Sequence, residues 1–69
     1  MNYGIRTKFD TGEAHEQRFE SNPNLEELKA VVHDGIEKPF VTSICLFNYD
    51  GEVELFAKKT LDGIYWERK

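Results

Sequence analysis

The sequence predicts an α+β domain, with elements in the order β-β-α-β-β-β and one helix packed on one face of a five-stranded antiparallel sheet. Three observations support this. Residues 2–9 alternate between polar and apolar side chains, as a half-buried strand does. Residues 25–34 carry apolar side chains at helical spacing. Residues 40–66 are rich in β-forming residues and are divided by two Asp-Gly pairs, which are typical of hairpin turns.

The length limits the chain to a single domain, residues 1–69. A core of this size rarely supplies more than roughly 3–5 kcal/mol of stability. The single cysteine cannot form an intrachain disulfide, and two histidines with one cysteine do not make a zinc site. We therefore expect no metal and no cofactor. Association with another chain is the remaining way to add stability.

The first hairpin is predicted from Asp10-Thr11-Gly12, which fits a three-residue loop with glycine in the left-handed position. This loop pairs Tyr3 with Phe19 and sets Arg6 opposite Glu16, an attractive cross-strand pair. The second strand, residues 14–20, is expected to have Phe19 as its main apolar anchor.

Two starts are open for the helix. Asn22 can cap it with Pro23 at the first helical position, or Asn24 can cap it with Glu27 closing a capping box. In either case we expect the helix to run to about residue 34. Gly35 is then expected in the left-handed conformation that ends many helices, with Ile36 folding back on the last turn.

The stretch from Phe40 to Gly51 is predicted to be a strand that is apolar on both faces. A two-residue type I′ turn at Asp50-Gly51 would pair Tyr49 with Glu52. The face expected to pack against the helix holds Phe40, Ile44, Leu46, Val53, Leu55 and Ala57. The opposite face is expected to hold Val41, Ser43, Cys45, Phe47, Tyr49, Glu52, Glu54, Phe56 and Lys58.

The pair Asp62-Gly63 predicts a second turn of the same kind. It would place Lys58 opposite Glu67 and Tyr65 on the face without the helix. Leu61, Ile64 and Trp66 would join the helix side.

Two orders of the strands, numbered along the chain, satisfy these turns. The order 2-1-3-4-5 puts the most apolar strand, residues 40–49, in the centre of the sheet. The order 2-1-5-4-3 would leave that strand at an exposed edge, which natural proteins avoid. We therefore favour 2-1-3-4-5.

The face without the helix is the candidate functional surface. An uncovered group of apolar and aromatic side chains marks an interface. We expect association with a second copy of the chain, related by two-fold symmetry, or with another protein. The expected interface residues are Val41, Cys45, Phe47, Tyr49, Phe56 and Tyr65. Charged residues at 52, 54, 58 and 67 would form its rim.

Nucleic-acid binding on the same face is a second interpretation. Aromatic side chains on an open sheet can stack bases, and Arg6, Lys8 and Arg18 could contact phosphates. It is disfavoured because Glu16 dilutes these cations and the chain carries 13 acidic against 9 basic residues. Whether the three cations face the same way as the aromatic side chains would discriminate between the two interpretations.

An acidic mimic of DNA, acting as an inhibitor, is a third interpretation. It would need the acidic side chains to follow one edge, and a net charge of −4 is small for this purpose. The residues concerned are Glu13, Glu16, Glu20, Glu26, Glu27 and Asp34.

The sequence does not predict an enzyme. Cys45 falls in the middle of an apolar strand, where a thiol is normally an inert small hydrophobe. Neither His15 nor His33 is placed beside it by the sequence. No phosphate-binding loop or dinucleotide fingerprint is present, so we infer no small-molecule substrate.

The first residues contain no apolar segment typical of a signal peptide, and no run approaches the roughly 20 apolar residues of a membrane span. With one free thiol, these observations predict a cytoplasmic protein that does not bind membranes.

Overall fold

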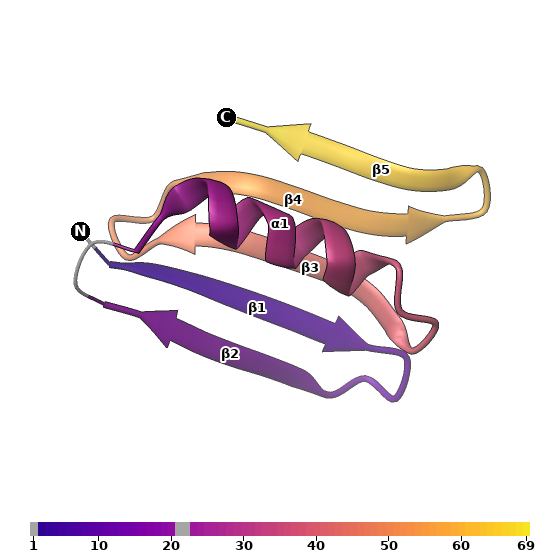
Figure 1. Ribbon diagram of the computed structural model, residues 1–69. Helices are drawn as coiled ribbons and strands as arrows, with labels where there is room; N and C mark the ends of the chain where they lie inside the picture. The colour runs from indigo at the N-terminus through magenta and orange to yellow at the C-terminus, as the bar shows by residue number, and fades with distance from the viewer. Residues whose placement is uncertain (1, 21–22) are drawn as a thin grey trace.

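A computed structural model describes residues 2–20 and 23–69. The elements follow the predicted order, β-β-α-β-β-β (Figure 1). Their bounds are β1 Tyr3–Phe9, β2 Ala14–Phe19, α1 Leu25–Ile36, β3 Val41–Asn48, β4 Val53–Thr60 and β5 Gly63–Arg68.

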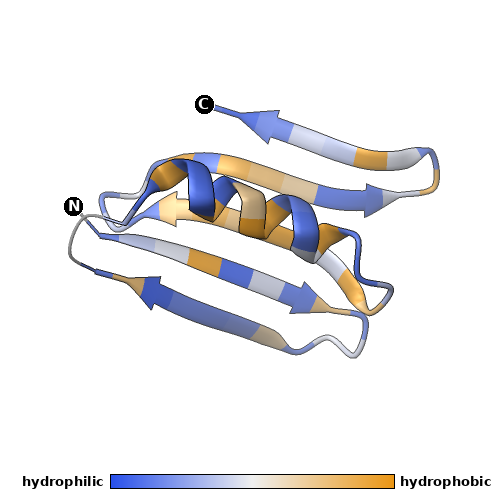
Figure 2. Ribbon diagram, viewed as in Figure 1, coloured by the Kyte–Doolittle hydropathy of each residue, from blue (hydrophilic) through white to orange (hydrophobic). Residues whose placement is uncertain are grey.

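The strands form one antiparallel sheet in the order β2-β1-β3-β4-β5, which confirms the favoured topology. The single helix lies over the middle of the sheet, on one face only (Figure 1). The core lies between α1 and the strands β1, β3 and β4, where the ribbon is most hydrophobic (Figure 2). Its buried side chains are Ile5, Leu28, Val32, Ile36, Val41, Ile44, Leu46, Leu55 and Ala57.

The first hairpin has the predicted register. Tyr3 is opposite Phe19, and Arg6 is opposite Glu16. The amide of Phe9 donates to the carbonyl of Glu13 at 2.9 Å, and the amide of Gly12 donates to the carbonyl of Phe9 at 3.0 Å. These two bonds close the three-residue loop that the sequence predicts.

The helix begins after Asn24, one of the two predicted caps. The Asn24 side chain accepts hydrogen bonds from the amides of Glu26 and Glu27, at 3.0 and 3.4 Å. These bonds satisfy amides that have no partner within the helix. Asn22, the other predicted cap, lies outside the described residues.

The predicted end of the helix is wrong. The helix continues through Gly35 to Ile36, and Glu37 is the C-cap residue. Gly35 stays right-handed, and its role is to allow close approach to the sheet. A Cβ atom there would lie 2.8 Å from Cδ1 of Ile44. Ile36, fully buried, is thus a core residue of the last helical turn.

The predicted positions of Phe40 in the core and Val41 on the face without the helix are wrong. Between β1 and β3, Lys8 is opposite Ser43 but Phe9 is opposite Val41, so β3 carries one extra residue. This bulge turns Val41 into the core, where it is 2% exposed. Phe40 precedes the strand and is 49% exposed, with its ring centroid 5.9 Å from that of Phe9. Val41 is therefore not an interface residue.

The predicted two-residue turn at Asp50-Gly51 is also wrong. The amide of Asn48 donates to the carbonyl of Glu52 at 2.9 Å, so the loop has three residues and Tyr49 does not pair with Glu52. The buried Asn48 side chain causes this, because its Oδ1 accepts from the amides of Asp50 and Glu52, each at 3.0 Å. Gly51 takes the left-handed position, with φ of 94°.

The longer loop has a consequence for β4. Phe47 is opposite Val53 while Leu46 is opposite Leu55, which is a second bulge. Val53 consequently lies on the face without the helix, beside Cys45 and Phe47, and is 40% exposed. Glu54 lies instead near Lys29 of the helix. Both predicted faces, Val53 in the core and Glu54 in the rim, are wrong.

The last hairpin has a two-residue loop, but the loop is Leu61-Asp62, with Thr60 opposite Gly63. The Thr60 hydroxyl accepts from the Asp62 amide at 3.2 Å and donates to the Gly63 carbonyl at 2.9 Å. The register therefore differs by two residues from the prediction, and Lys58 is opposite Tyr65 rather than Glu67. A shift of two leaves every strand side chain on its predicted face. Leu61 moves to the tip and is fully exposed.

Candidate binding face

The sheet surface opposite the helix is the candidate site, and we call it the helix-free face. Among the described residues, the helix contacts β1, β3 and β4 from the other side, and no element covers this one. The face consists of Gly4, Arg6, Lys8, Ala14, Glu16, Arg18, Ser43, Cys45, Phe47, Val53, Phe56, Lys58, Tyr65 and Glu67, with Tyr49 from the β3–β4 loop at one end.

Gly4 shapes the apolar end of the face. The rings of Phe47 and Tyr49 meet edge to face, with centroids 5.3 Å apart. A Cβ atom at Gly4 would lie 2.7 Å from Cζ of Phe47 and 2.8 Å from the hydroxyl oxygen of Tyr49. The two rings therefore lie against the backbone of β1, which only glycine permits.

Glu16 is the centre of a polar network next to these rings. It accepts from Nη2 of Arg6 at 2.8 Å and from the Tyr49 hydroxyl at 2.9 Å. The guanidinium of Arg18 lies 4.5 Å from the Tyr49 ring centroid, a cation–π contact. The hydrogen bond from Arg6, followed by that from Tyr49, holds the pKa of Glu16 below its ordinary value. Partial desolvation and the bond to Glu16 raise the pKa of Tyr49.

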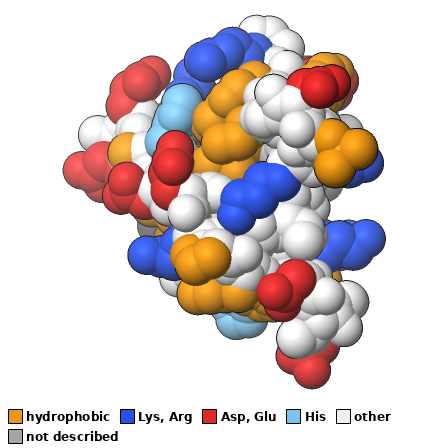
Figure 3. All heavy atoms as spheres, turned by 90° about the vertical axis from the view of Figure 1, so that its right-hand side faces the viewer, with side chains coloured by type: hydrophobic (Ala, Val, Ile, Leu, Met, Phe, Trp, Pro, Cys, Tyr) orange, Lys and Arg blue, Asp and Glu red, His pale blue; other side chains and the backbone are white. Residues whose placement is uncertain are grey.

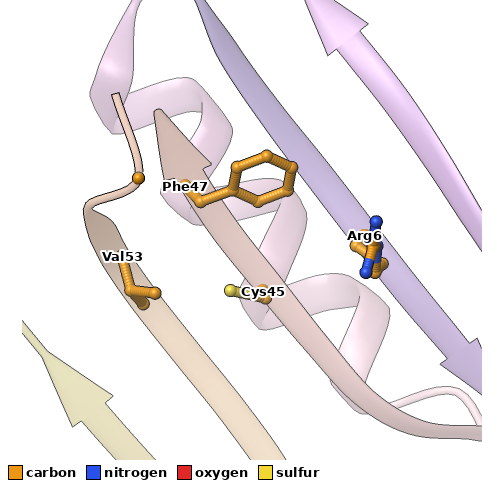
Figure 4. A pocket seen from close by; sticks show the side chains of 5 residues that line it. Arg6, Cys45, Phe47 and Val53 are labelled. Atoms are coloured by element: carbon orange, nitrogen blue, oxygen red, sulfur yellow. The ribbon is translucent and has the colours of Figure 1, made fainter. Parts of the chain in front are cut away.

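Two shallow hollows meet at Cys45 and Arg6. The first, of about 250 Å³, is lined by apolar side chains of β3 and β4 together with Arg6 (Figure 4). Its residues are Arg6, Cys45, Phe47, Gly51 and Val53. The second, of about 220 Å³, continues towards the other end of the strands. Its residues are Arg6, Lys8, Ala14, Ser43, Cys45 and Phe56. Together they make a trough along the face.

The cations share the face with the aromatic side chains. In the pairing of β1 with β3, Arg6 is opposite Cys45 and Lys8 is opposite Ser43, while Arg18 lies over Tyr49. This is the geometry that nucleic-acid binding required. However, Arg6 is paired with Glu16, and Arg18 with Glu20 at 3.2 Å. Two of the three cations are therefore already neutralised within the chain.

Five of the six predicted interface residues lie on or beside the helix-free face. Cys45, Phe47 and Phe56 are partly buried there, whereas Tyr49 and Tyr65 are 40% and 50% exposed. The Phe56 and Tyr65 rings meet at 6.5 Å, and the Tyr65 hydroxyl donates to Glu67 at 3.0 Å. The bond to Glu67 raises the pKa of Tyr65. Val41 is the exception, for the reason given above.

Sequence reasoning placed Gly4 on the outer face of the first strand without giving it a role, and it assigned Val53 to the wrong face. Gly4 could have been noticed as a glycine inside an alternating strand, which often marks a close approach of other groups. Val53 could not have been found without the bulge, which only the pairing of β3 with β4 reveals.

Outside this face, the exposed large apolar side chains of the described residues are Val31, Phe40 and Leu61. At the end of the sheet where the β1–β2 and β4–β5 turns lie, hydrophobic side chains are separated by charged ones (Figure 3). Single hydrophobic side chains on a surface are normal and mark no site.

The residues considered for catalysis are not assembled. Cys45 lies on the helix-free face, and its burial raises the pKa of the thiol, which disfavours the reactive thiolate. His33 is on the other side, stacked on Trp66 with ring centroids 4.4 Å apart. His15 is opposite Thr7 in β1. Within residues 2–20 and 23–69, no three His, Cys, Asp or Glu side chains come together as a metal site requires.

The acidic residues of the third interpretation are divided between the edge strand β2 with its flanks and the helix. Glu16 lies on the helix-free face, bonded to Arg6. Glu26 and Glu27 lie in the first turn of the helix, and Asp34 near its end, on the opposite side of the sheet. This distribution gives no support to mimicry of DNA.

The fold and the face together define a small α+β domain whose sheet is covered on one side by a single helix. Comparisons with protein-family models, with curated proteins and with solved structures found no match for the chain. Among the described residues, no helix has the length and apolar character needed to cross a membrane.

Proposed function

We propose that this protein is a non-enzymatic binding domain that associates with a protein, either a second copy of itself or another chain, through the helix-free face. The observation that carries the proposal is the apolar centre of this face. Cys45, Phe47, Val53, Phe56 and Tyr65 lie together on adjacent strands, on the side without the helix. An uncovered group of this kind is typical of an interaction surface.

The size of the domain supports the same proposal. A chain of 69 residues buries only about 60% of the surface that its unfolded form exposes. Here one helix covers one side of five strands, so the apolar side chains of the other side contribute little to the core. Burial of that face against a partner would add the missing hydrophobic stabilisation.

The proposal is tested by solution mass and by one matched pair of substitutions. Val53, 40% exposed, lies on the helix-free face, and Val31, 47% exposed, lies on the helix. If the partner is a second copy, sedimentation from micromolar to millimolar concentration will show a dimer. Val53→Glu should remove the dimer, because it buries a charge at the interface, while Val31→Glu should leave it intact.

A mass of one chain at all concentrations would exclude the second copy and leave a different protein as the partner. A dimer that survives Val53→Glu, but not Val31→Glu, would move the interface to the helix and contradict the proposal.

Binding of single-stranded nucleic acid through the same face is the second candidate. It is favoured by the position of Arg6, Lys8 and Arg18 beside the aromatic side chains. We rank it second, because Arg6 and Arg18 are paired with glutamates and Arg18 covers the Tyr49 ring. A labelled single strand that shifts at low salt, and no longer shifts with Lys8→Glu, would reverse this ranking.

A further inference from the structure

We propose that the occupant of the helix-free face is an acidic segment of a partner protein, with carboxylates at one end of the trough and an apolar side chain at the other. This inference rests on the proposed function and specifies the chemistry of the partner. Three features of the face support it. Lys8 and Lys58 lie on either side of Ser43, and we call these three residues the lysine row. An apolar hollow lies next to this row. The face has an excess of positive charge on an acidic chain.

The lysine row crosses three strands. Lys8 of β1 is opposite Ser43 of β3, and Ser43 is opposite Lys58 of β4. Neighbouring strands are about 4.8 Å apart, so the two lysines stand about 10 Å apart with a hydroxyl between them. Both lysines are exposed, and neither forms an ion pair with any other described residue. This arrangement suits a carboxylate, which can accept from an ammonium group and a hydroxyl together.

The apolar hollow begins one row further along the same strands. On this face of β3, Ser43 of the lysine row is followed by Cys45 and then by Phe47. Phe47 is opposite Val53 of β4. The Phe47 ring, Cys45 and Val53 line the hollow of about 250 Å³ (Figure 4). This space would accept one apolar side chain of the occupant. The face therefore has its two lysines at one end and its apolar hollow at the other, where Arg6 and Arg18 are paired with glutamates.

The charge of the face is opposite to that of the chain. It carries four cations, Arg6, Lys8, Arg18 and Lys58, against Glu16 and Glu67, and Glu20 is paired with Arg18 beside them, so the excess of positive charge comes from the two lysines. The whole chain has a net charge of −4. A surface that is locally basic on an acidic protein favours an anionic partner and disfavours a second copy of an acidic chain.

A face-to-face pair of copies also lacks local complementarity. A two-fold axis along the strands would set Lys8 against Lys58 of the second copy. An axis across the strands would set the lysine row against the apolar hollow. Neither arrangement gives the lysines a carboxylate, since Glu16 is bonded to Arg6 and Tyr49, and Glu67 to Tyr65. Like charges brought together at an interface cost several kcal/mol.

Nucleic acid fits less well, because few aromatic planes are open for stacking. The Phe47 ring lies on Gly4 and meets Tyr49 edge to face, and Arg18 occupies one side of Tyr49. Phe56 is partly buried and meets Tyr65 edge to face.

The test is a selection from a random dodecapeptide library displayed on phage, with the full chain as bait. We expect enriched peptides to combine Asp or Glu with at least one large apolar residue. Their affinity, measured by fluorescence polarisation of the synthetic peptides, should fall with rising salt, because screening weakens exposed ion pairs.

Two double variants locate the binding site. Lys8→Glu/Lys58→Glu should weaken binding of the selected peptides by about tenfold or more, since each lysine becomes a like charge to the ligand. Lys29→Glu/Lys38→Glu makes the same charge change in and after the helix, and should leave the affinity within about twofold. Lys8→Gln/Lys58→Gln should give an intermediate loss. Circular dichroism spectra of the variants should match the spectrum of the original chain.

Each other outcome overturns the inference in a recognisable way. Neutral peptides that depend on Val53 but not on the lysines would refute the acidic partner and leave the proposed function standing. A dimer removed by Val53→Glu would make the second copy the occupant. A single-stranded oligonucleotide that binds, with no peptide enriched, would contradict both the inference and the proposed function. Peptides that tolerate Lys8→Glu/Lys58→Glu would place the site elsewhere.

Discussion

Glu16 is a residue whose contacts can be removed one at a time by substituting its partners. Its two carboxylate oxygens are bonded to different partners, Arg6 and Tyr49, from different strands or loops. The carboxylate thus ties the β3–β4 loop to the first hairpin across the helix-free face. Because all three side chains are exposed or partly exposed, we expect the network to orient the face more than to stabilise the fold.

The pKa of Glu16 should therefore report on this network. The pKa is lowered in the folded state, so its stabilising contribution is present above the ordinary glutamate pKa of about 4.3 and is lost as the pH falls through the lowered pKa. We expect Arg6→Gln to raise the pKa of Glu16 more than Tyr49→Phe does, because the bond from Arg6 is the largest cause of the shift. The NMR chemical shift of the Glu16 carboxyl carbon, followed against pH, would give the pKa of Glu16 in the original protein and in the two variants.

Arg68→Gln is a suitable control, since Arg68 lies at the end of β5 over Trp66 and makes no described contact with Glu16. A Glu16 pKa that does not change in Arg6→Gln would show that the ion pair does not persist in solution.

At the scale of elements, the two bulges and the helix end account for most differences between prediction and structure. Strand periodicity assigns side chains to faces only while pairing is regular, and one extra residue reverses every assignment beyond it. Thr42 and Glu54 are such extra residues, and no local pattern distinguishes them from ordinary strand residues. The first loop is as predicted, but the loop length at Asp50-Gly51 and the loop position at Asp62-Gly63 depend on hydrogen bonds of Asn48 and Thr60 that only the folded chain reveals.

Gly35 offers a prediction about the packing of the helix on the sheet. Alanine in a helix is favoured over glycine by roughly 1 kcal/mol. We nevertheless expect Gly35→Ala to destabilise the protein, because the new Cβ would lie 2.8 Å from Cδ1 of Ile44, which is 2% exposed and has little room to move. Ile44→Val removes that atom at a cost of about 0.5–1.5 kcal/mol.

The double variant Gly35→Ala/Ile44→Val should then be more stable than the sum of the two single effects predicts, by about 1 kcal/mol or more. Urea denaturation of the four proteins would measure this coupling. Additive effects would mean that the helix shifts on the sheet rather than pressing on Ile44.

For the molecule as a whole, the fold was predictable because several independent signals agreed. The apolar stripe of the helix predicted that it covers one face of the sheet, and the first turn predicted the register of β1 with β2. The strand that is apolar on both faces predicted β3 in the middle of the sheet. The candidate binding face was predictable in outline, since the face without the helix follows from the topology. Its charge pattern was not, because the lysine row depends on pairings of β3 with both β1 and β4.

The same architecture predicts an order of local stabilities. β3 is paired on both sides and covered by α1, whereas β2 and β5 are edge strands, and β5 meets the helix through the stacking of Trp66 on His33. Backbone amides of β3 and its bonded neighbours should exchange with solvent most slowly, and those of β2 and β5 fastest. Hydrogen exchange followed by NMR would rank them. Trp66→Ala should speed exchange in β5 and leave β2 unchanged, because Trp66 packs against the core from β5. Slower exchange in β2 than in β3 would contradict this order.

The stacking of Trp66 on His33 has a practical consequence for optical work. Trp66 is the only tryptophan of the chain and lies on the helix side, while Tyr49 and Tyr65 lie on the helix-free face. Indole emission will therefore report whether the helix stays docked, because its one source lies away from the helix-free face. Tyrosine emission mixes the two surfaces, because Tyr3 packs against the core. An unlabelled sample can thus be followed by its tryptophan to show that a partner binds without undocking the helix.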